Sequence, residues 1–294
     1  ELFGIPVAGT PAHSWVMNFP SELEAFRAYA DLFPDACLLL VDTYDTLKSG
    51  VPNAIRVFRE LREKGHEPKG IRLDSGDLAY LSKRARRMLD DAGFPDAIIC
   101  ASGDLDEHVI ASLKNQGAKI DLWGVGTKLI TSSDMPALGG VYKLSALYPA
   151  GGGEIPKIKL SDNSDKITNP AFKDVWRIYD NETGKAEADL IVVRGETFDE
   201  SKPLTIFHPK ETWKRITFTD YTVRPLTVQV MRGGELCAPL PPLSEICAYA
   251  SREKESFWDE YKRQDNPHVY KVDLSQKLFD IKNKLISQIR GNDG

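Results

Sequence analysis

Short apolar runs alternate with amphipathic stretches through the first part of the chain, and this alternation predicts strands and helices in turn. The unbroken apolar run at residues 37–41 is typical of a strand covered on both faces. Strands are predicted at residues 5–8, 37–41, 70–73, 97–100 and 120–124. The amphipathic stretches predict helices after Ser21, where Glu24 completes a capping box, and from Pro52, Leu78 and Val109.

The pattern changes after Met135. Turn residues there separate shorter β-type runs at residues 141–147, 157–160, 175–179, 188–193, 204–207 and 222–231. Two prolines at 241–242 introduce a long helix expected to reach Tyr261, and a final amphipathic helix is predicted over 274–289. We therefore expect three parts. Residues 1–136 form the part of an α/β barrel that carries the active-site strand ends, residues 137–240 form a β-rich region that completes the barrel and a second domain, and residues 241–294 form carboxyl-terminal helices.

Repeated β–α units predict an α/β fold, in which right-handed crossovers join the strands of a parallel sheet. If these strands curve into a barrel, their carboxyl ends converge on one mouth, where α/β enzymes build their active sites.

Polar residues follow each of the predicted strands in this region. In chain order the junctions carry Thr10 and His13, then Asp42, then Arg72, Asp74, Ser75 and Gly76, then Ser102, Gly103 and Asp104, and last Gly124, Gly126 and Thr127. An imidazole on such a turn can serve as base, acid or nucleophile. An arginine near the end of a parallel strand is costly unless it meets an anion. The glycines at 124 and 126 with Thr127 offer backbone N–H groups and a hydroxyl to a phosphate.

Each junction also has a local explanation. His13 could cap the next element, and Asp42, Asp74 or Asp77 could cap helices. Five polar junctions at successive strand ends would then be five separate coincidences, so we favour one shared pocket. Its groups suit a phosphorylated sugar, a metal ion and a second anionic substrate.

The composition limits the partners and the cellular location that we expect for the chain. The formal net charge of -5 argues against broad nucleic-acid binding. No apolar run approaches the roughly 20 residues that span a bilayer, so no membrane partner is expected. The four cysteines are scattered and form no C-x-x-C pair, which favours a reducing, cytoplasmic location. The chain starts at Glu1, almost inside a predicted strand, and we expect that a preceding segment is missing.

Residues 9–16, 41–45, 70–78 and 124–127 resemble signatures of the nicotinate phosphoribosyltransferases, and residues 266–270 and 273–275 resemble the tail of bacterial members. The resemblance covers nearly the whole chain except for the family's amino-terminal part. It implies an irregular, TIM-like α/β barrel of the type II phosphoribosyltransferases, with an added mostly β region and carboxyl-terminal helices.

The implied reaction joins nicotinate to phosphoribosyl pyrophosphate (PRPP), giving nicotinate mononucleotide and pyrophosphate in NAD salvage. In the family, ATP hydrolysis is coupled to synthesis through transient phosphorylation of the histidine that matches His13. ATP is therefore an expected co-substrate and a homodimer an expected assembly. Mg²⁺ is expected to neutralise the departing pyrophosphate, with no ligands assigned.

The resemblance also assigns site residues. Thr10 and Arg72 match the positions that contact nicotinate, and Thr127 with its flanking glycines matches the donor-phosphate site. Asp74, Gly103 and Asp104 match the ribose and pyrophosphate region. Asp42 or Asp74 is expected to stabilise the positive charge that develops on the ribose. Ser75, Gly76 and Ser102 complete the predicted substrate-binding set.

Two departures from the family keep alternatives open. The absent amino-terminal part carries an aromatic residue and an arginine motif that help bind substrates, so an inactive fragment that still binds phosphate ligands is one alternative. Ala171 stands where relatives usually have glycine. A nicotinamide phosphoribosyltransferase is the nearest alternative enzyme. A quinolinate-specific one is less favoured, because only Arg72 and Lys128 are basic at these junctions.

Overall fold

The computed structural model describes residues 2–163, 166–211 and 213–291. The chain divides into two compact units, residues 1–139 and 140–294, and each is described here by itself. The expected division at 136 and 240 into three parts stays a prediction.

The first unit is built from repeated β–α pairs. Its strands are β1 (Leu38–Leu40), β2 (Gly70–Leu73), β3 (Ile98–Ala101) and β4 (Leu122–Trp123). They form one parallel sheet in the order β1-β2-β3-β4, with Leu38 opposite Gly70 and Gly70 opposite Ile98. Its helices are α1 (His13–Met17), α2 (Glu22–Leu32), α3 (Val51–Glu63), α4 (Leu78–Asp91), α5 (Glu107–Asn115) and α6 (Thr127–Ile130), with shorter turns of helix at Pro34–Ala36 and Thr46–Gly50.

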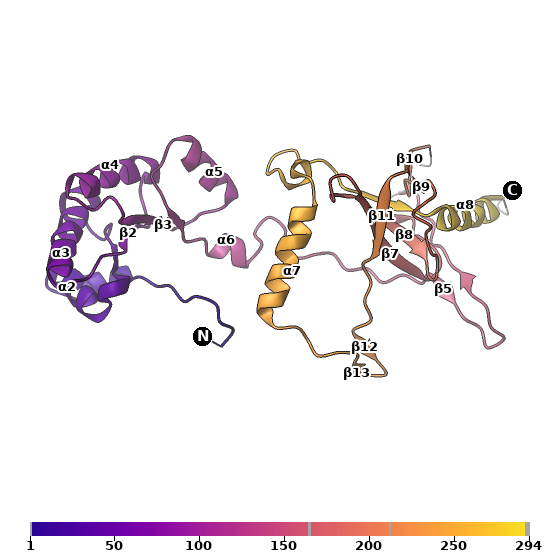
Figure 1. Ribbon diagram of the computed structural model, residues 1–294, viewed down its shortest axis with the longest axis horizontal. Helices are drawn as coiled ribbons and strands as arrows, with labels where there is room; N and C mark the ends of the chain where they lie inside the picture. Colours follow the sequence, from indigo (N-terminus) through magenta and orange to yellow (C-terminus); the bar gives the residue numbers. More distant parts are fainter. Residues whose placement is uncertain (1, 164–165, 212, 292–294) are drawn as a thin grey trace. The chain divides into compact units, whose positions relative to one another are not determined.

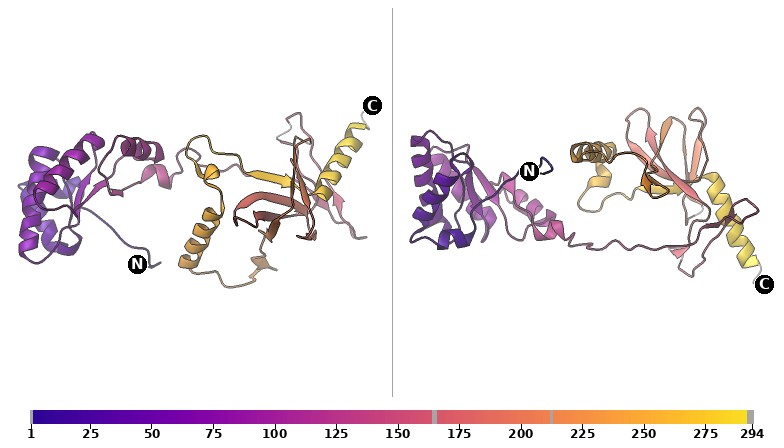
Figure 2. Two further views of the ribbon diagram at one scale, coloured as in Figure 1. Left: turned by 45° about the horizontal axis from the view of Figure 1, so that its top comes forward. Right: turned by 90° about the horizontal axis from the view of Figure 1, so that it is seen from below.

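Helices α2, α3 and α4 lie side by side along the outer face of this curled sheet (Figures 1 and 2). Their apolar faces bury Phe26, Phe58 and Leu89 against Leu39 and Ile71 of the strands. Full burial of such side chains stabilises a fold by about 1.5–3 kcal/mol each. The layer fixes the strands, and with them the loops at their carboxyl ends.

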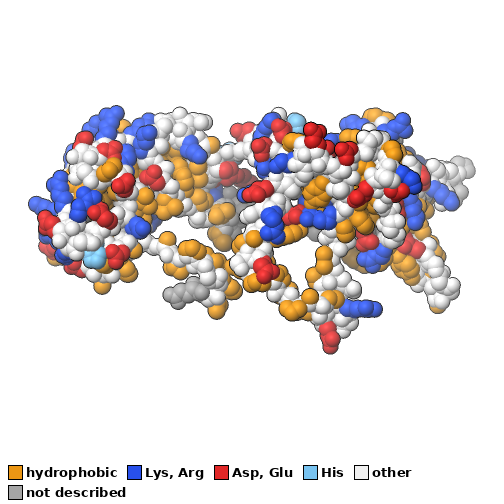
Figure 3. Space-filling view, in the orientation of Figure 1, with side chains coloured by type: hydrophobic (Ala, Val, Ile, Leu, Met, Phe, Trp, Pro, Cys, Tyr) orange, Lys and Arg blue, Asp and Glu red, His pale blue; other side chains and the backbone are white. Residues whose placement is uncertain are grey.

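The strand predicted at residues 5–8 is wrong. The segment has no partner strand among the described residues, and a strand needs a neighbour to satisfy its backbone N–H and C=O groups. Ile5 and Val7 are consequently 57% and 80% exposed. Figure 3 shows the hydrophobic side chains of this segment uncovered.

The second unit contains a mixed sheet in the order β10-β9-β14-β8-β7-β11. Its strands are β7 (Lys173–Asp180), β8 (Ala186–Val193), β9 (Leu204–Phe207), β10 (Arg215–Phe218), β11 (Tyr221–Pro225) and β14 (Lys271–Leu274). Two small antiparallel pairs accompany it, β5 (Ala146–Leu147) with β6 (Ile155–Pro156) and β12 (Met231–Arg232) with β13 (Glu235–Leu236). Helix α8 (Gln276–Gly291) packs on β8 and β9. The core contains Ile178, Leu190 and Ile206.

The helix predicted to reach Tyr261 is shorter than expected. Helix α7 (Leu243–Ser256) ends where Phe257 takes an extended backbone, and a short 3-10 turn follows at Asp259–Lys262. The Phe257 ring lies 4.6 Å from the Arg177 guanidinium, and this cation–π contact stabilises the extended conformation that follows the helix. Residue 274, predicted to be helical, ends strand β14 instead.

Among the described residues, the helices are all too short or too polar to cross a membrane.

Candidate active site at the carboxyl ends of the strands

The loop after β2 contains two acidic residues, Asp74 and Asp77, which have different roles. Asp77 caps α4, because its side chain accepts a hydrogen bond from the Tyr80 backbone N–H at 2.9 Å. Asp74 takes no part in the cap and instead turns its carboxylate toward side chains from other loops. The local capping explanation therefore holds for Asp77 and not for Asp74.

Arg72 is the centre of the resulting cluster. Its Nε donates to Ser102 Oγ at 2.6 Å, and its two terminal nitrogens donate to Thr10 Oγ1 at 2.7 Å and to Asp74 Oδ1 at 2.5 Å. These bonds join the loops after β2 and β3 to the segment before α1. Three predicted site residues from widely separated parts of the sequence thus meet around one guanidinium.

The Asp74 carboxylate is surrounded by donors. Burial favours its neutral form, but hydrogen bonds from Ser102 and Arg72, with the charges of Arg72 and His13, outweigh burial and lower the pKa of Asp74. The carboxylate is therefore held ionised. A fixed negative charge at this edge of the sheet is suited to stabilising a positive charge on a ligand.

His13, the first residue of α1, joins the same cluster. Its Nδ1 lies 3.1 Å from Thr43 Oγ1, and its Nε2 lies 3.7 Å from Asp74 Oδ2. The imidazole is 40% exposed and so remains open to a ligand. The sequence predicts no separate role for Thr43, and the only signal for one is its position directly after Asp42 in a polar junction.

Asp42 follows strand β1, and its side chain stabilises the loop that follows strand β2. Its Oδ2 accepts from the Asp74 backbone N–H at 2.8 Å and from the Ser75 hydroxyl at 2.6 Å. Asp45, not Asp42, caps the helical turn at Thr46–Gly50, because its side chain accepts hydrogen bonds from Leu47 N and Lys48 N. The other oxygen, Oδ1 of Asp42, is buried and has no hydrogen-bond partner among the described residues. Such an atom costs free energy unless something supplies a donor or a cation.

Two glycines allow the loops to approach each other closely. A Cβ on Gly103 would lie 2.8 Å from the Asp74 carbonyl oxygen, and Gly103 has a φ of +109°. A Cβ on Gly124 would lie 3.2 Å from the Ser102 Cβ. Only glycine combines this backbone conformation with this proximity at residue 103. Both glycines therefore shape the cluster without contributing a side chain.

The remaining predicted residues lie outside the Arg72 cluster. Gly76 adopts a φ of +76° in the β2 loop, and Asp104, Gly126 and Thr127 are exposed. Their proposed contacts with the ribose and phosphates stay predictions.

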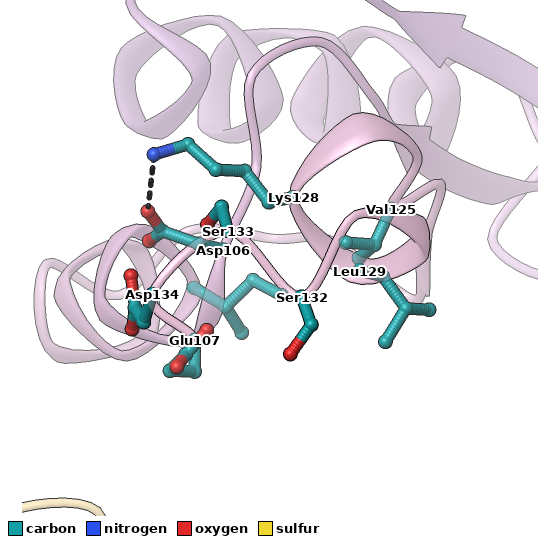
Figure 4. Close-up of a pocket in the computed structure, with 9 residues that line it drawn as sticks. Asp106, Glu107, Val125, Lys128, Leu129, Ser132, Ser133 and Asp134 are labelled. Atoms are coloured by element: carbon teal, nitrogen blue, oxygen red, sulfur yellow. Dashed lines mark ion pairs between the residues drawn. The ribbon is translucent and has the colours of Figure 1, made fainter. Parts of the chain in front are cut away.

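A pocket of about 370 Å³ lies beside the predicted phosphate-binding loop (Figure 4). Lys128 reaches Asp106 at 3.8 Å across it, while Glu107 and Asp134 line the same pocket. The ligand-type atoms of Glu107, His108 and Asp134 lie within 4.8 Å of one another, but all three residues are exposed. None of the residues around Arg72 lines this pocket, so it is a separate feature of the unit.

Comparisons with known proteins match both units. Residues 172–282 fit the family model described as the nicotinate phosphoribosyltransferase C-terminal domain. The nicotinate phosphoribosyltransferase of Bacillus subtilis (strain 168) is 47% identical over 290 residues, which cover 99% of this chain and 59% of that protein.

Over nearly its whole length, this chain is similar to nicotinate phosphoribosyltransferases.

Further nicotinate phosphoribosyltransferases give the same result. The protein of that name from Dictyostelium discoideum is 36% identical, covering 97% of this chain and 56% of its own length. The crystal structure of human nicotinic acid phosphoribosyltransferase superposes with a TM-score of 0.78 at 28% identity, covering 97% of this chain and 63% of the human one. The chain thus spans about three fifths of the length of the relatives it matches.

The fold is shared more widely than the family. The nicotinate-nucleotide pyrophosphorylase of Pyrococcus furiosus superposes with a TM-score of 0.56 at 18% identity, over 87% of this chain and 57% of that one. The predicted fold class, that of the type II phosphoribosyltransferases, is confirmed.

Proposed function

We propose that this chain carries the nicotinate-binding and ribosyl-transfer residues of a nicotinate phosphoribosyltransferase. The reaction joins nicotinate to PRPP, releases pyrophosphate and serves NAD salvage, with ATP hydrolysis coupled through phosphorylation of His13. The similarity to nicotinate phosphoribosyltransferases supports the reaction, and the Arg72 cluster supports its assignment to particular residues.

The arrangement of donors on Arg72 carries this proposal. A guanidinium has five N–H donors. Its bonds to Thr10, Asp74 and Ser102 use one donor on each of its three nitrogens. One N–H therefore remains on each terminal nitrogen, which is what a bidentate carboxylate requires. Nicotinate has such a carboxylate, whereas the amide of nicotinamide offers one oxygen and no full charge.

With its carboxylate held by Arg72, nicotinate would present the pyridine nitrogen as the nucleophile. That nitrogen forms a bond to the anomeric carbon of the ribose while the bond to pyrophosphate breaks. Positive charge builds on the ribose ring during this exchange, and the ionised Asp74 would stabilise it. Asp42 acts on the same charge by fixing the Asp74 backbone.

His13 is the proposed phosphate acceptor from ATP. Thr43 Oγ1, 3.1 Å from Nδ1, orients the ring, and Nε2, which lies 3.7 Å from Asp74 Oδ2, would attack the terminal phosphorus of ATP as its bond to ADP breaks and ADP leaves. Labelled ATP should transfer phosphate to the wild-type protein and not to His13→Ala, whereas Thr43→Ala should be labelled more slowly. Full labelling of His13→Ala would contradict this role.

Mg²⁺ fits this set of residues. The unpartnered, buried Oδ1 of Asp42 is a hard oxygen donor of the kind that the ion prefers, directly or through a bound water. Bound there, the ion would neutralise charge on the pyrophosphate group. A homodimer, a cytoplasmic location and donor-phosphate contacts at Gly124, Gly126 and Thr127 belong to the same proposal.

Nicotinate binding by Arg72→Ala tests the proposal. Truncating one partner of a desolvated charge pair costs about 2–5 kcal/mol, so the affinity should fall about 30-fold or more. Arg59→Ala on the exposed face of α3 removes the same charge elsewhere and should leave binding unchanged. Saturation-transfer NMR with nicotinate and nicotinamide as competing ligands measures both effects.

The same measurement, with a turnover assay beside it, separates the alternatives. Preference for nicotinamide would favour the nicotinamide-specific enzyme and contradict the proposed role of Arg72. Binding of nicotinate without formation of the mononucleotide from PRPP would favour the inactive phosphate-binding fragment.

A further inference from the structure

Helix α1, which begins at His13, has few means of holding its own position. It is five residues long, Ala12 stands at its N-cap without a side-chain hydrogen bond, and its first turn contains no acidic residue. Isolated helices shorter than about 12 residues are marginal in water. Residues 2–8 before it are exposed and pair with no strand among the described residues. The place of the His13 imidazole must therefore be set by contacts between α1 and other elements.

Trp15 connects α1 to helix α2. The indole Nε1 donates to the Ala25 carbonyl oxygen at 3.0 Å, and the ring packs edge-on against Tyr29, with the ring centroids 6.3 Å apart. The next residue, Val16, is completely buried in the same core. A buried indole N–H needs an acceptor, and a single acceptor fixes how the ring is turned. Trp15 therefore sets the rotation of α1 on α2.

The surface of α2 that receives Trp15 belongs to the core of the first unit. Ala25 and Phe26 are completely buried, and Tyr29 is 9% exposed. The Tyr29 Oη also lies 3.5 Å from the Gly9 carbonyl oxygen, at the outer limit of a hydrogen bond. Tyr29 thus contacts the chain on both sides of residues 10–13. Close packing of this kind leaves the indole little freedom to move.

Trp15 and His13 lie on different sides of α1. Side chains two positions apart on a helix do not face each other. Trp15 faces α2, whereas the His13 imidazole faces the loops after β1 and β2, with Nδ1 3.1 Å from Thr43 Oγ1 and Nε2 3.7 Å from Asp74 Oδ2. Because both residues belong to one turn of helix, a rotation of α1 that releases the indole would also move the imidazole away from these two oxygens.

We propose that Trp15 is a positioning residue for His13. Its hydrogen bond to Ala25 and its ring contact with Tyr29 hold α1 in the rotation that places the imidazole against Thr43. This inference rests on the proposed phosphorylation of His13, in which Nε2 forms a bond to the terminal phosphorus of ATP as the bond to ADP breaks. Misplacing a reacting group by about 1 Å can slow such a step about 100-fold. Trp15 acts on the reaction through His13 rather than by contact with a substrate.

The variant Trp15→Phe tests the proposal, because it keeps a ring beside Tyr29 and removes the indole N–H. At saturating ATP, labelled phosphate should be transferred to this variant about 10-fold more slowly than to wild type, while the ATP concentration that gives half the maximal rate stays within about 2-fold. Trp15→Leu, which also removes the ring, should be slower still. Trp213→Phe makes the same substitution at an indole that is 75% exposed, and it should leave the rate unchanged.

Two measurements separate positioning from a loss of folded protein. In a single turnover, unfolded molecules lower the amount of phosphate transferred but not the rate constant, so we expect a smaller rate constant at full amplitude. The second measurement is NMR of the protein without ATP. The nuclear Overhauser effect between the His13 ring protons and the Thr43 methyl group should weaken in Trp15→Phe and persist in Trp213→Phe, because the two side chains are in contact in the wild-type structure.

The outcomes distinguish this inference from the proposed function. A wild-type rate constant in Trp15→Phe would overturn the positioning role while the role of His13 stands, and so would an unchanged Overhauser effect in that variant. A wild-type protein that takes no phosphate on His13 would contradict the proposed function instead. The Overhauser effect would then decide by itself whether Trp15 places the imidazole.

Discussion

At the scale of single residues, Asp74 connects most of the candidate site. Arg72 and Ser102 donate to it, His13 approaches it, and Asp42 holds its backbone. A change that moves Asp74 should therefore disturb all of its neighbours, even if the change adds no charge and removes no hydrogen bond.

Gly103→Ala is such a change. The added Cβ would lie 2.8 Å from the Asp74 carbonyl oxygen, and the residue would also have to keep a φ of +109°. We expect the substitution to lower the free energy of unfolding by about 3 kcal/mol and to weaken nicotinate binding.

Gly93→Ala is the matched control, measured with Gly103→Ala by urea unfolding. Its φ of +87° is also left-handed, but no atom lies within 4 Å of its added Cβ. The loss there should be about 1 kcal/mol, with unchanged nicotinate binding. Equal losses at the two positions would show that close approach to Asp74 is unimportant.

Ala171 illustrates the same backbone rule without a ligand. Its φ of +72° lies in the left-handed region that favours glycine. The residue is buried under the Lys173 ammonium, and that hydrogen bond with the packing around it holds the conformation. The sequence departure noted there does not open the loop.

At the scale of elements, local signals predict most of the first unit. Ser21 caps α2 by accepting from Glu24 N, and β2 occupies the predicted residues 70–73. The strand at residues 5–8 failed because apolar character does not supply a pairing partner. Strand β14 was not anticipated, because it pairs with β8, which is some 80 residues away along the chain. Short strands that depend on distant partners carry little local signal.

The sequence predicts where in the fold the candidate site lies, but it predicts few of the contacts between the site's side chains. Strand ends located Arg72, Asp74 and His13 in one region, and the structure brings them together. The role of Thr43 and the unpartnered oxygen of Asp42 depend on side-chain geometry across three loops, which no spacing along the sequence encodes.

The substitution Asp77→Ala tests whether the residue that caps α4 is independent of ligand binding at the candidate site. Removing the bond to the Tyr80 N–H should lower the free energy of unfolding by about 1 kcal/mol. Nicotinate affinity should stay within about 2-fold of wild type, because Asp77 does not contact the Arg72 cluster. Chemical denaturation and ligand titration on the same sample measure both quantities, and a large drop in affinity would contradict the separation.

At the scale of the whole molecule, each of the two units has a hydrophobic core of its own. Residues 131–144 are exposed throughout, and so are residues 227–242 within the second unit. Local exposure of this kind marks the backbone that proteases reach first.

Brief digestion with a protease of broad specificity should therefore cut first within 131–144 and 227–242. Mass spectrometry of the earliest fragments locates the cuts. Early cleavage inside α2, α3 or α4 would show that the core of the first unit is less protected than its burial indicates.

The loops after β1 and β2 each contain two aspartates with different contacts. Asp45 and Asp77 begin helical segments, whereas Asp42 and Asp74 take part in the candidate site. Helix initiation and the proposed chemistry thus draw on different side chains a few positions apart, so a change at Asp74 should leave the start of both helical segments in place.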